Sequence, residues 1–274
     1  MDRGPRIIDR YSKQRLVEAT HRSWNSMLNL FAGYPRAEYR VTPSYTLLNS
    51  GTNVAMLNRV LETSLAPEDA DETISEVIQT FESRRLPFTW QVDPWDRPSD
   101  LAERLERAGF HRDETPGMAV KISDLAEPEK SPGFSYVRVE SPEQLHTYAW
   151  LLGRAYGMPE HLWDWLAGAW TNLGVVHHIK HYVGYLGGTP VATSSILYSD
   201  GVAGLYNVAT QPEARGRGVG GMISYVPFKD ARELGYRFGI LHSSRMGYSV
   251  YRRLGFEEIC KLIRYQWSPA EGAT

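Results

Sequence analysis

Cysteine is almost absent from this sequence: Cys260 is the only one in 274 residues. A single cysteine excludes an intramolecular disulfide and any zinc site built from several cysteines. Proteins that do without disulfides fit a reducing compartment, so we expect the cytoplasm.

Long apolar runs and a surplus of charge are also lacking. Nowhere do eighteen apolar residues follow one another, and the first sixteen residues contain no apolar signal core. The formal net charge is -2, whereas proteins that bind nucleic acid or anionic lipid usually carry a basic surplus. We therefore expect neither nucleic acid nor a membrane as a partner. The sequence indicates no oligomeric state.

The composition is otherwise that of a folded globular protein, with 42% hydrophobic and 23% charged residues and a heavy load of 16 tyrosines and 8 tryptophans. The length favours two domains over one. Segment 125–133 is polar and contains two prolines and a glycine, which is linker composition. We therefore predict one domain over residues 1–126 and another over 134–274.

The second domain alternates strand and helix patterns, which predicts a mixed α/β fold. Ser141 and Pro142 are typical of a helix start, and Pro227 should kink or end the helix in which it falls. Strands are expected at 134–139, 182–186, 191–198, 203–209, 238–243 and 256–267, and helices after residues 141 and 159, from about 219 to 234 and over 247–254.

The first domain predicts a related order of elements. Helices are expected over 7–31, 71–85 and 99–108, with strands near 39 and 45 and over 88–92 and 118–122. Its last four elements repeat the helix, strand, helix, strand order that follows Gly218, and each half has a Gly-Phe pair after the later helix. Where the second half has a glycine-rich loop, however, the first has the acidic, glycine-free segment 66–71. We infer a duplicated fold with one competent anion site.

The glycine-rich loop over 215–221 has the composition of a phosphate cradle. Its four glycines leave backbone N–H groups accessible at the start of a helix, where anions bind well, and two arginines add charge. A flexible basic turn, a dinucleotide site and an acyl-CoA site are the alternatives. A dinucleotide site needs a carboxylate about twenty residues on, and strand 238–243 has none. The glycine-rich loop also lacks the Lys-Ser or Lys-Thr pair of a triphosphate loop, so acyl-CoA is favoured.

Two motifs resemble those of the GNAT acetyltransferase superfamily. Arg215, Gly218 and Gly220 match the family's cofactor signature R/Q-x-x-G-x-G/A, and Tyr251, followed after three residues by Gly255-Phe256, resembles its second signature. The resemblance covers residues 134–267 well. The first half resembles the degenerate partner domain of two-domain members. The family implies a mixed, mostly antiparallel sheet flanked by helices, with a degenerate GNAT-like N-terminal domain.

The resemblance also implies roles for individual residues. Strand 203–209 should diverge from strand 238–243, so that pantetheine pairs with the exposed backbone. Tyr251 is implied as the general acid, and Ser244 stands where many members have asparagine. The implied cofactor-binding set is Val208, Thr210, Arg215, Gly216, Arg217, Gly218, Val219, Gly220, Gly221 and Ser244.

No general base is evident in strand 203–209, which lacks carboxylates and histidines. His242 is our candidate, because a neutral imidazole can accept a proton from an ammonium. A core histidine or a chain of water molecules are the alternatives. His177, His178 and His181 have no adjacent carboxylate and enter an expected strand, so we do not expect a metal. By resemblance, the helix that contains Trp163, Trp165 and Trp170 walls the acceptor side and suits either a cationic amine or core packing.

These observations predict an N-acetyltransferase that moves an acetyl or other small acyl group from acyl-CoA, with acetyl-CoA as cofactor, to a small-molecule primary amine in a ternary complex. Direct attack is expected because no histidine partner is placed beside Cys260. Two alternatives remain open: a non-catalytic acyl-CoA-binding regulatory or assembly module, and a purely structural protein without CoA affinity.

Overall fold

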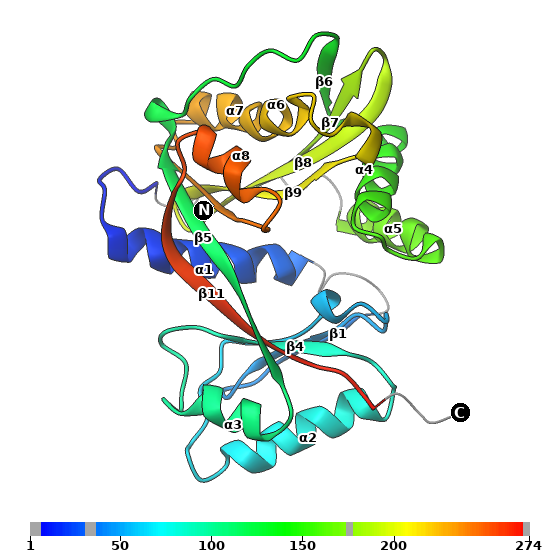
Figure 1. The fold of residues 1–274 in the computed structure, drawn as a ribbon. Helices are drawn as coiled ribbons and strands as arrows, with labels where there is room; N and C mark the ends of the chain where they lie inside the picture. Colours follow the sequence, from blue (N-terminus) through cyan, green and yellow to red (C-terminus); the bar gives the residue numbers. More distant parts are fainter. Residues whose placement is uncertain (1–6, 31–36, 174–177, 271–274) are drawn as a thin grey trace. The chain divides into compact units, whose positions relative to one another are not determined.

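The chain divides into two compact units in the computed structural model, which describes residues 7–30, 37–173 and 178–270. Unit 1 comprises Met1–Met27 and Pro116–Cys260, and unit 2 comprises Leu28–Thr115 and Lys261–Thr274. Strands β5 (His111–Lys121) and β11 (Glu257–Trp267) each begin in one unit and end in the other (Figure 1).

This division differs from the predicted boundary between residues 126 and 134. The start of the chain is grouped with unit 1, because Ile8, Leu16 and Ala19 pack with Phe238 and Ile240. The end of the chain is grouped with unit 2, where residues 263–267 of β11 pair with β4. The linker composition of segment 125–133 indicates an exposed segment. It does not indicate with which strands the two ends of the chain pack or pair.

Unit 1 contains a sheet in the order β5-β10-β9-β8-β7-β6. Neighbouring strands are antiparallel except for β10 and β9, which run parallel. The other bounds are β6 Phe134–Arg138, β7 Ile179–Leu186, β8 Thr189–Ser199, β9 Val202–Thr210 and β10 Phe238–His242. This mixed, mostly antiparallel sheet confirms the predicted fold class.

Helices cover both faces of this sheet. On one face, α6 (Val219–Tyr225), α7 (Pro227–Glu233) and α8 (Tyr248–Arg253) share a core with the strands. α4 (Pro142–Ala155) contacts β7, β8 and β9, and α5 (Trp163–Leu173) packs on α4 (Figure 1). α1 (Lys13–Asn29) lies on the same face as α4, since Ser23 bonds Tyr206 of β9.

Local sequence signals explain where two of these helices start or stop. Ser141 caps α4 in a reciprocal capping box, in which its side chain accepts from the Gln144 N–H at 3.3 Å. Pro227 has no N–H to give to a continuous helix, and the chain indeed ends α6 at Tyr225 and begins α7 at Pro227.

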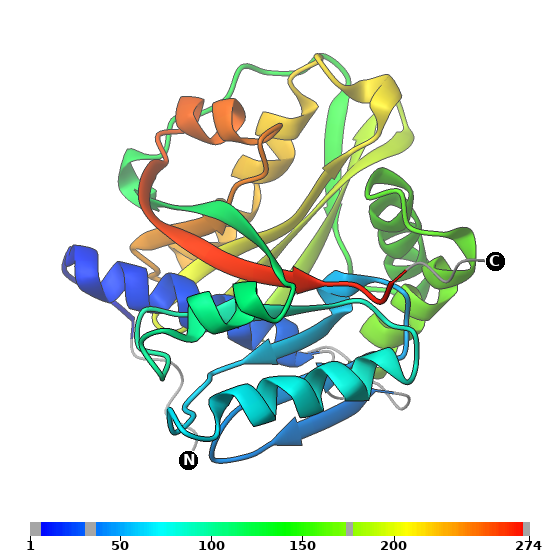
Figure 2. The same cartoon turned by 60° about the horizontal axis from the view of Figure 1, so that its bottom comes forward.

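Unit 2 has a sheet in the order β1-β2-β3-β4-β11, whose remaining strands are β1 Glu38–Val41, β2 Thr46–Asn49, β3 Asn58–Leu61 and β4 Phe88–Val92. Helices α2 (Ala70–Glu82) and α3 (Leu101–Arg107) lie along one face (Figure 2), where Phe81, Phe88 and Trp90 form the core. The sequence analysis missed β3. Its four buried residues include an asparagine and an arginine, which obscure the strand pattern.

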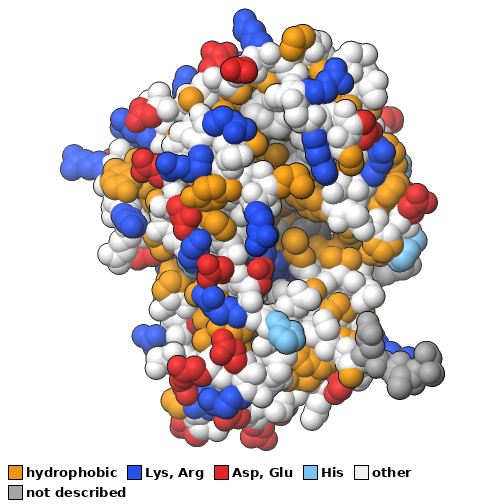
Figure 3. Space-filling model, viewed as in Figure 1, with side chains coloured by type: hydrophobic (Ala, Val, Ile, Leu, Met, Phe, Trp, Pro, Cys, Tyr) orange, Lys and Arg blue, Asp and Glu red, His pale blue; other side chains and the backbone are white. Residues whose placement is uncertain are grey.

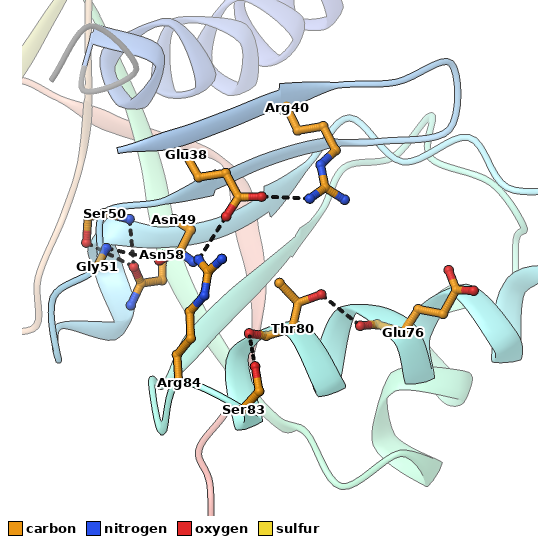
Figure 4. A network of polar contacts seen from close by, with 10 residues as sticks. All are labelled: Glu38, Arg40, Asn49, Ser50, Gly51, Asn58, Glu76, Thr80, Ser83 and Arg84. Carbon is orange, nitrogen blue, oxygen red and sulfur yellow. Dashed lines mark hydrogen bonds and ion pairs between the residues drawn. The ribbon is translucent and has the colours of Figure 1, made fainter. Parts of the chain in front are cut away.

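Polar side chains support the loops and edge of unit 2 (Figure 4). The amide of Asn58 donates to the carbonyls of Thr52 and Pro87, each at 2.8 Å, and its oxygen accepts from the backbone N–H of Ser50 at 3.0 Å. On the edge strand β1, Glu38 accepts from Arg84 at 2.8 Å and from Arg40. These two arginines hold the pKa of the Glu38 carboxyl below its usual range.

Charge is spread over the surface, with basic and acidic side chains interspersed on the face that Figure 3 presents. None of the helices in the described ranges is both long and apolar enough to cross a bilayer.

Candidate functional site

A cavity of about 1120 Å³ opens in unit 1. It exceeds the common range of roughly 300 to 1,000 Å³ for small-molecule sites, so an extended ligand would fit. Its walls come from the end of β9, the glycine-rich loop, the start of α8 and segment 127–129. The principal lining residues are Glu127, Pro128, Glu129, Tyr156, Val208, Ala209, Thr210, Arg215, Gly216, Gly218, Gly220, Gly221, Ser244, Arg245, Met246, Gly247, Tyr251 and Arg253.

Two parallel strands diverge at this cavity. Pairing between β9 and β10 joins Ala203, Gly204 and Leu205 to residues 239–241 and goes no further, although β9 continues to Thr210. The predicted divergence is confirmed. Beyond Leu205, β9 lacks β10 as a ladder partner, and its last three residues line the cavity.

The backbone of the glycine-rich loop adopts conformations that residues with a side chain rarely adopt. Gly216 and Gly218 have φ angles of 73° and 77°, and Gly218 is the N-cap of α6. A Cβ on Gly221 would lie 3.3 Å from Pro128, and one on Gly220 would lie 3.5 Å from Oγ1 of Thr210. The loop is thus a close-fitting cradle held against the end of β9.

Most of the predicted cofactor-binding residues come together around this cavity. Arg217 and Val219 are the exceptions, since neither lines it. The side chain of Val219 is fully buried in the core of unit 1, so only its backbone is available to the loop. Arg217 is exposed, whereas Arg215 lines the cavity and donates from Nε to the carbonyl of Thr210 at 3.1 Å.

Tyr251 of α8 lies in the wall of the cavity and is only 7% exposed. Burial raises the pKa of its phenol well above the usual value, while a hydrogen bond with Ser224 partly opposes this effect. The hydroxyl therefore stays protonated at neutral pH. A neutral phenol in an apolar wall is suited to donate a proton.

Ser244 also lines the cavity and organises the start of α8. Its Oγ accepts from the backbone N–H of Gly247 at 3.1 Å, and its carbonyl accepts from the N–H of Tyr248 at 3.1 Å. The hydroxyl is therefore already engaged by the turn that precedes Tyr251.

His242 is not among the residues that line the cavity. Its ring packs edge-on against Trp24 of α1, with centroids 4.7 Å apart, and against Tyr206, with centroids 5.8 Å apart. This aromatic packing matches the core-histidine alternative, and a catalytic base role for His242 stays a prediction.

Sequence analysis missed several lining residues. Glu127 and Glu129 come from the segment interpreted as a linker, and no local signal places a polar loop against a distant glycine. Arg253 lies within the second motif and Arg245 lies just before it, so their proximity to it could have indicated a cavity position.

Two of the tryptophans on the helix expected to wall the acceptor side are engaged in contacts within unit 1. Trp163 donates from Nε1 to the carbonyl of Met158 at 2.8 Å, and Trp170 is 2% exposed against His181. Among the described residues no three potential metal ligands cluster. His178 is exposed, and His177 lies outside the described residues.

Comparisons with known proteins point to one superfamily. Residues 199–259 match the family model for the acetyltransferase (GNAT) domain. A GCN5-related N-acetyltransferase from Kribbella flavida has a similar structure, with a TM-score of 0.66, 20% identity and coverage of 93% of this chain and 96% of that one. A search of curated proteins found no match.

Two further structures resemble most of the chain. A conserved protein of unknown function from Staphylococcus epidermidis gives a TM-score of 0.64 at 13% identity, covering 86% of this chain and 96% of that one. A tandem GNAT protein from the clavulanic acid biosynthesis pathway gives 0.59 at 13% identity, covering 92% and 96%. The chain therefore has the fold of a tandem GNAT protein, and the segment that forms the glycine-rich loop and α8 matches the model of the acetyltransferase (GNAT) domain.

Proposed function

We propose that this protein is an N-acetyltransferase that transfers an acetyl or other small acyl group from acyl-CoA to a primary amine by direct attack in a ternary complex. The observation that carries the proposal is one cavity with three features in its wall. These are a glycine cradle, the end of β9 that no longer pairs with β10, and a buried tyrosine, contributed by Gly218, Val208 and Tyr251.

The cradle fits the pyrophosphate of CoA. A branched residue at Gly218 would have to adopt an unfavourable φ, and its Cβ would already be in van der Waals contact with Glu129 and Ser131 at 3.7 Å. Glycine avoids this strain and leaves the backbone bare. Arg215 adds positive charge at the same wall. The backbone of Val208 and Thr210, at the end of β9, would receive the pantetheine arm.

Bound acyl-CoA would supply the acyl group as an activated thioester. Tyr251 would keep a proton on its Oη at neutral pH and give it to the departing sulfur, which otherwise leaves as an anion. Ser244 would act indirectly, by fixing the first turn of α8 and so the position of Tyr251. Cys260 is not required, since it is not part of the cavity wall.

The acceptor is proposed to be a small cationic amine, and its general base is left to His242 or to ordered water. A non-catalytic CoA-binding module is the second candidate. It is favoured by two observations: Oγ of Ser244 already accepts a backbone N–H, and His242 lies outside the cavity wall.

Calorimetric titration with CoA and with acetyl-CoA tests the binding half of the proposal, with one site per chain expected because segment 66–71 has no glycine. Release of free thiol from acetyl-CoA across a panel of primary amines tests the chemistry. Binding without turnover on the whole panel would support the module, and absence of CoA binding would refute both candidates.

Release of thiol that depends on Cys260 would contradict direct attack. The Cys260→Ala variant should turn over at nearly the parent rate. Trapping of an acyl-cysteine in the parent, together with loss of activity in the variant, would replace the ternary-complex mechanism by a covalent one.

A further inference from the structure

β9 contains a bulge just before its cavity-lining end. Thr193 of β8 pairs with Ala209, and Ser195 pairs with Tyr206, so one residue of β8 stands opposite two residues of β9. Asn207, one of those two, has a φ of 52°, a left-handed conformation rare for residues other than glycine.

The bulge changes which face the later side chains occupy. Tyr206 bonds Ser23 of α1, and Asn207 points to the same face, since its Nδ2 lies 3.4 Å from Oγ of Ser195. Side chains normally alternate along a strand. The extra residue shifts this phase, so that Val208 packs in the core that contains α6, and Thr210 lies beside Gly220. Without the bulge, both would face α1 and α4.

Two side chains of β8 hold Asn207 in place. Thr193 donates from Oγ1 to the carbonyl oxygen of Asn207 at 2.9 Å. Ser195 accepts from the side-chain amide of Asn207. The left-handed residue is therefore fixed through its backbone and through its side chain, both by the neighbouring strand.

Ser195 is itself held by two buried side chains. Its Oγ bonds the hydroxyl of Tyr148 on α4 and lies 2.8 Å from Nδ1 of His181 on β7. Burial lowers the pKa of His181 to about 3, so the ring is neutral. Ser195 can then accept from Tyr148 and Asn207 and donate to Nδ1 of His181, which satisfies its hydroxyl fully. This arrangement places the ring proton of His181 on Nε2.

We propose that Thr193 and Ser195, the latter supported by Tyr148 and His181, are positioning residues that maintain the β9 bulge at Asn207 and thereby turn Val208 and Thr210 toward the glycine-rich loop. The expected effect on CoA affinity rests on the proposed function. The effect on the direction of Thr210 does not.

Substitutions of Asn207 separate backbone conformation from side-chain contacts. Asn207→Gly keeps the left-handed φ accessible, whereas Asn207→Val disfavours it strongly. Asp200 provides a matched control, because it has a φ of 51° in the turn between β8 and β9, at the opposite end of the strand from the cavity. Asp200→Val should lower the melting temperature as Asn207→Val does.

CoA affinity should fall about tenfold or more in Asn207→Val, stay within about threefold of the parent in Asn207→Gly and remain at the parent value in Asp200→Val. Ser195→Ala should weaken CoA binding less than Asn207→Val, because Thr193 still holds the backbone. Equal losses in Asn207→Val and Asp200→Val would show a general stability effect and overturn the inference.

A ligand-free measurement keeps the two proposals apart. In the parent and in Asn207→Gly, the methyl group of Thr210 should show a nuclear Overhauser effect to the α-protons of Gly220, and in Asn207→Val this signal should vanish. Its persistence in Asn207→Val would overturn the positioning role. A parent that binds no CoA yet shows the predicted signals would refute the proposed function and support the positioning inference.

Discussion

Gly247 and Tyr251 are in such close contact that a Cβ on the glycine would lie 2.7 Å from Cε2 of the tyrosine ring. Gly247 has an ordinary φ of -78°, so its backbone does not require glycine. Glycine is required at this position because a larger residue would occupy the space of the tyrosine ring. The glycine that precedes α8 thus determines where the buried phenol lies in the cavity wall.

Gly247→Ala should therefore displace the ring of Tyr251 without removing its hydroxyl. We expect kcat to fall by about tenfold to a hundredfold, because a shift of about an ångström at a reacting group has such effects. CoA affinity should change little. Gly168→Ala is the control, since a Cβ there meets nothing within 4 Å. Unchanged kcat in Gly247→Ala would show that the position of Tyr251 is not critical.

Removal of the phenol hydroxyl tests its role as an acid. Tyr251→Phe should lower kcat by about a hundredfold or more and leave CoA affinity nearly unchanged. Tyr248→Phe on the same helix, whose hydroxyl lies 3.3 Å from Glu258, should remain active. Steady-state kinetics with acetyl-CoA and a reactive amine would compare the two variants, and equal activities would exclude Tyr251 as the acid.

The pH profile provides a second test of Tyr251. Because its folded pKa is raised, the protonated form that donates persists to higher pH than for a free tyrosine, whose pKa is about 10. The kcat of the parent should therefore show no tyrosine-dependent fall between pH 8 and about 10. A fall in that range that Tyr251→Phe abolishes would contradict the assigned pKa direction.

A substitution that changes the charge of the glycine-rich loop and one that changes its shape should weaken CoA binding in different ways. Arg215→Glu should weaken CoA binding most at low salt, because screening shortens an exposed repulsion. Gly218→Val should weaken binding at every salt concentration and also lower the melting temperature, since its φ of 77° disfavours a branched residue. Parent-like affinity of Arg215→Glu at low salt would overturn the pyrophosphate assignment.

The buried hydrogen bonds of Asn58 predict that replacing this residue destabilises unit 2. In Asn58→Asp, a carboxylate would face the carbonyls of Thr52 and Pro87 in place of two N–H donors. The free energy of unfolding should fall by about 2 to 4 kcal/mol at pH 7. The loss should shrink in acid, because the repelled carboxyl has a raised pKa and a protonated one can donate again. Asn53→Asp, at an exposed position, should change it by less than about 0.5 kcal/mol. Equal losses would contradict the structural role of Asn58.

Local chemistry by itself determined the glycine-rich loop, the capped start of α4 and the break at Pro227. In each case the cause is local: positive φ at Gly218, a reciprocal bond between Ser141 and Gln144, and a missing N–H. The alternation of strand and helix patterns likewise predicted the mixed α/β class. Such features depend on residues a few positions apart, so a single sequence contains them.

The other features of the fold and of the cavity were decided only by the tertiary structure. It assigned the ends of the chain to different units, placed Glu127 and Glu129 in the cavity wall and packed His242 against Trp24. It also formed the bulge at Asn207, where the carbonyl oxygen and the side-chain amide of Asn207 bond Thr193 and Ser195 of the neighbouring strand β8. These features arise where segments distant in the chain meet, and strand partners and buried contacts are set by the packing of the whole unit rather than by local propensity.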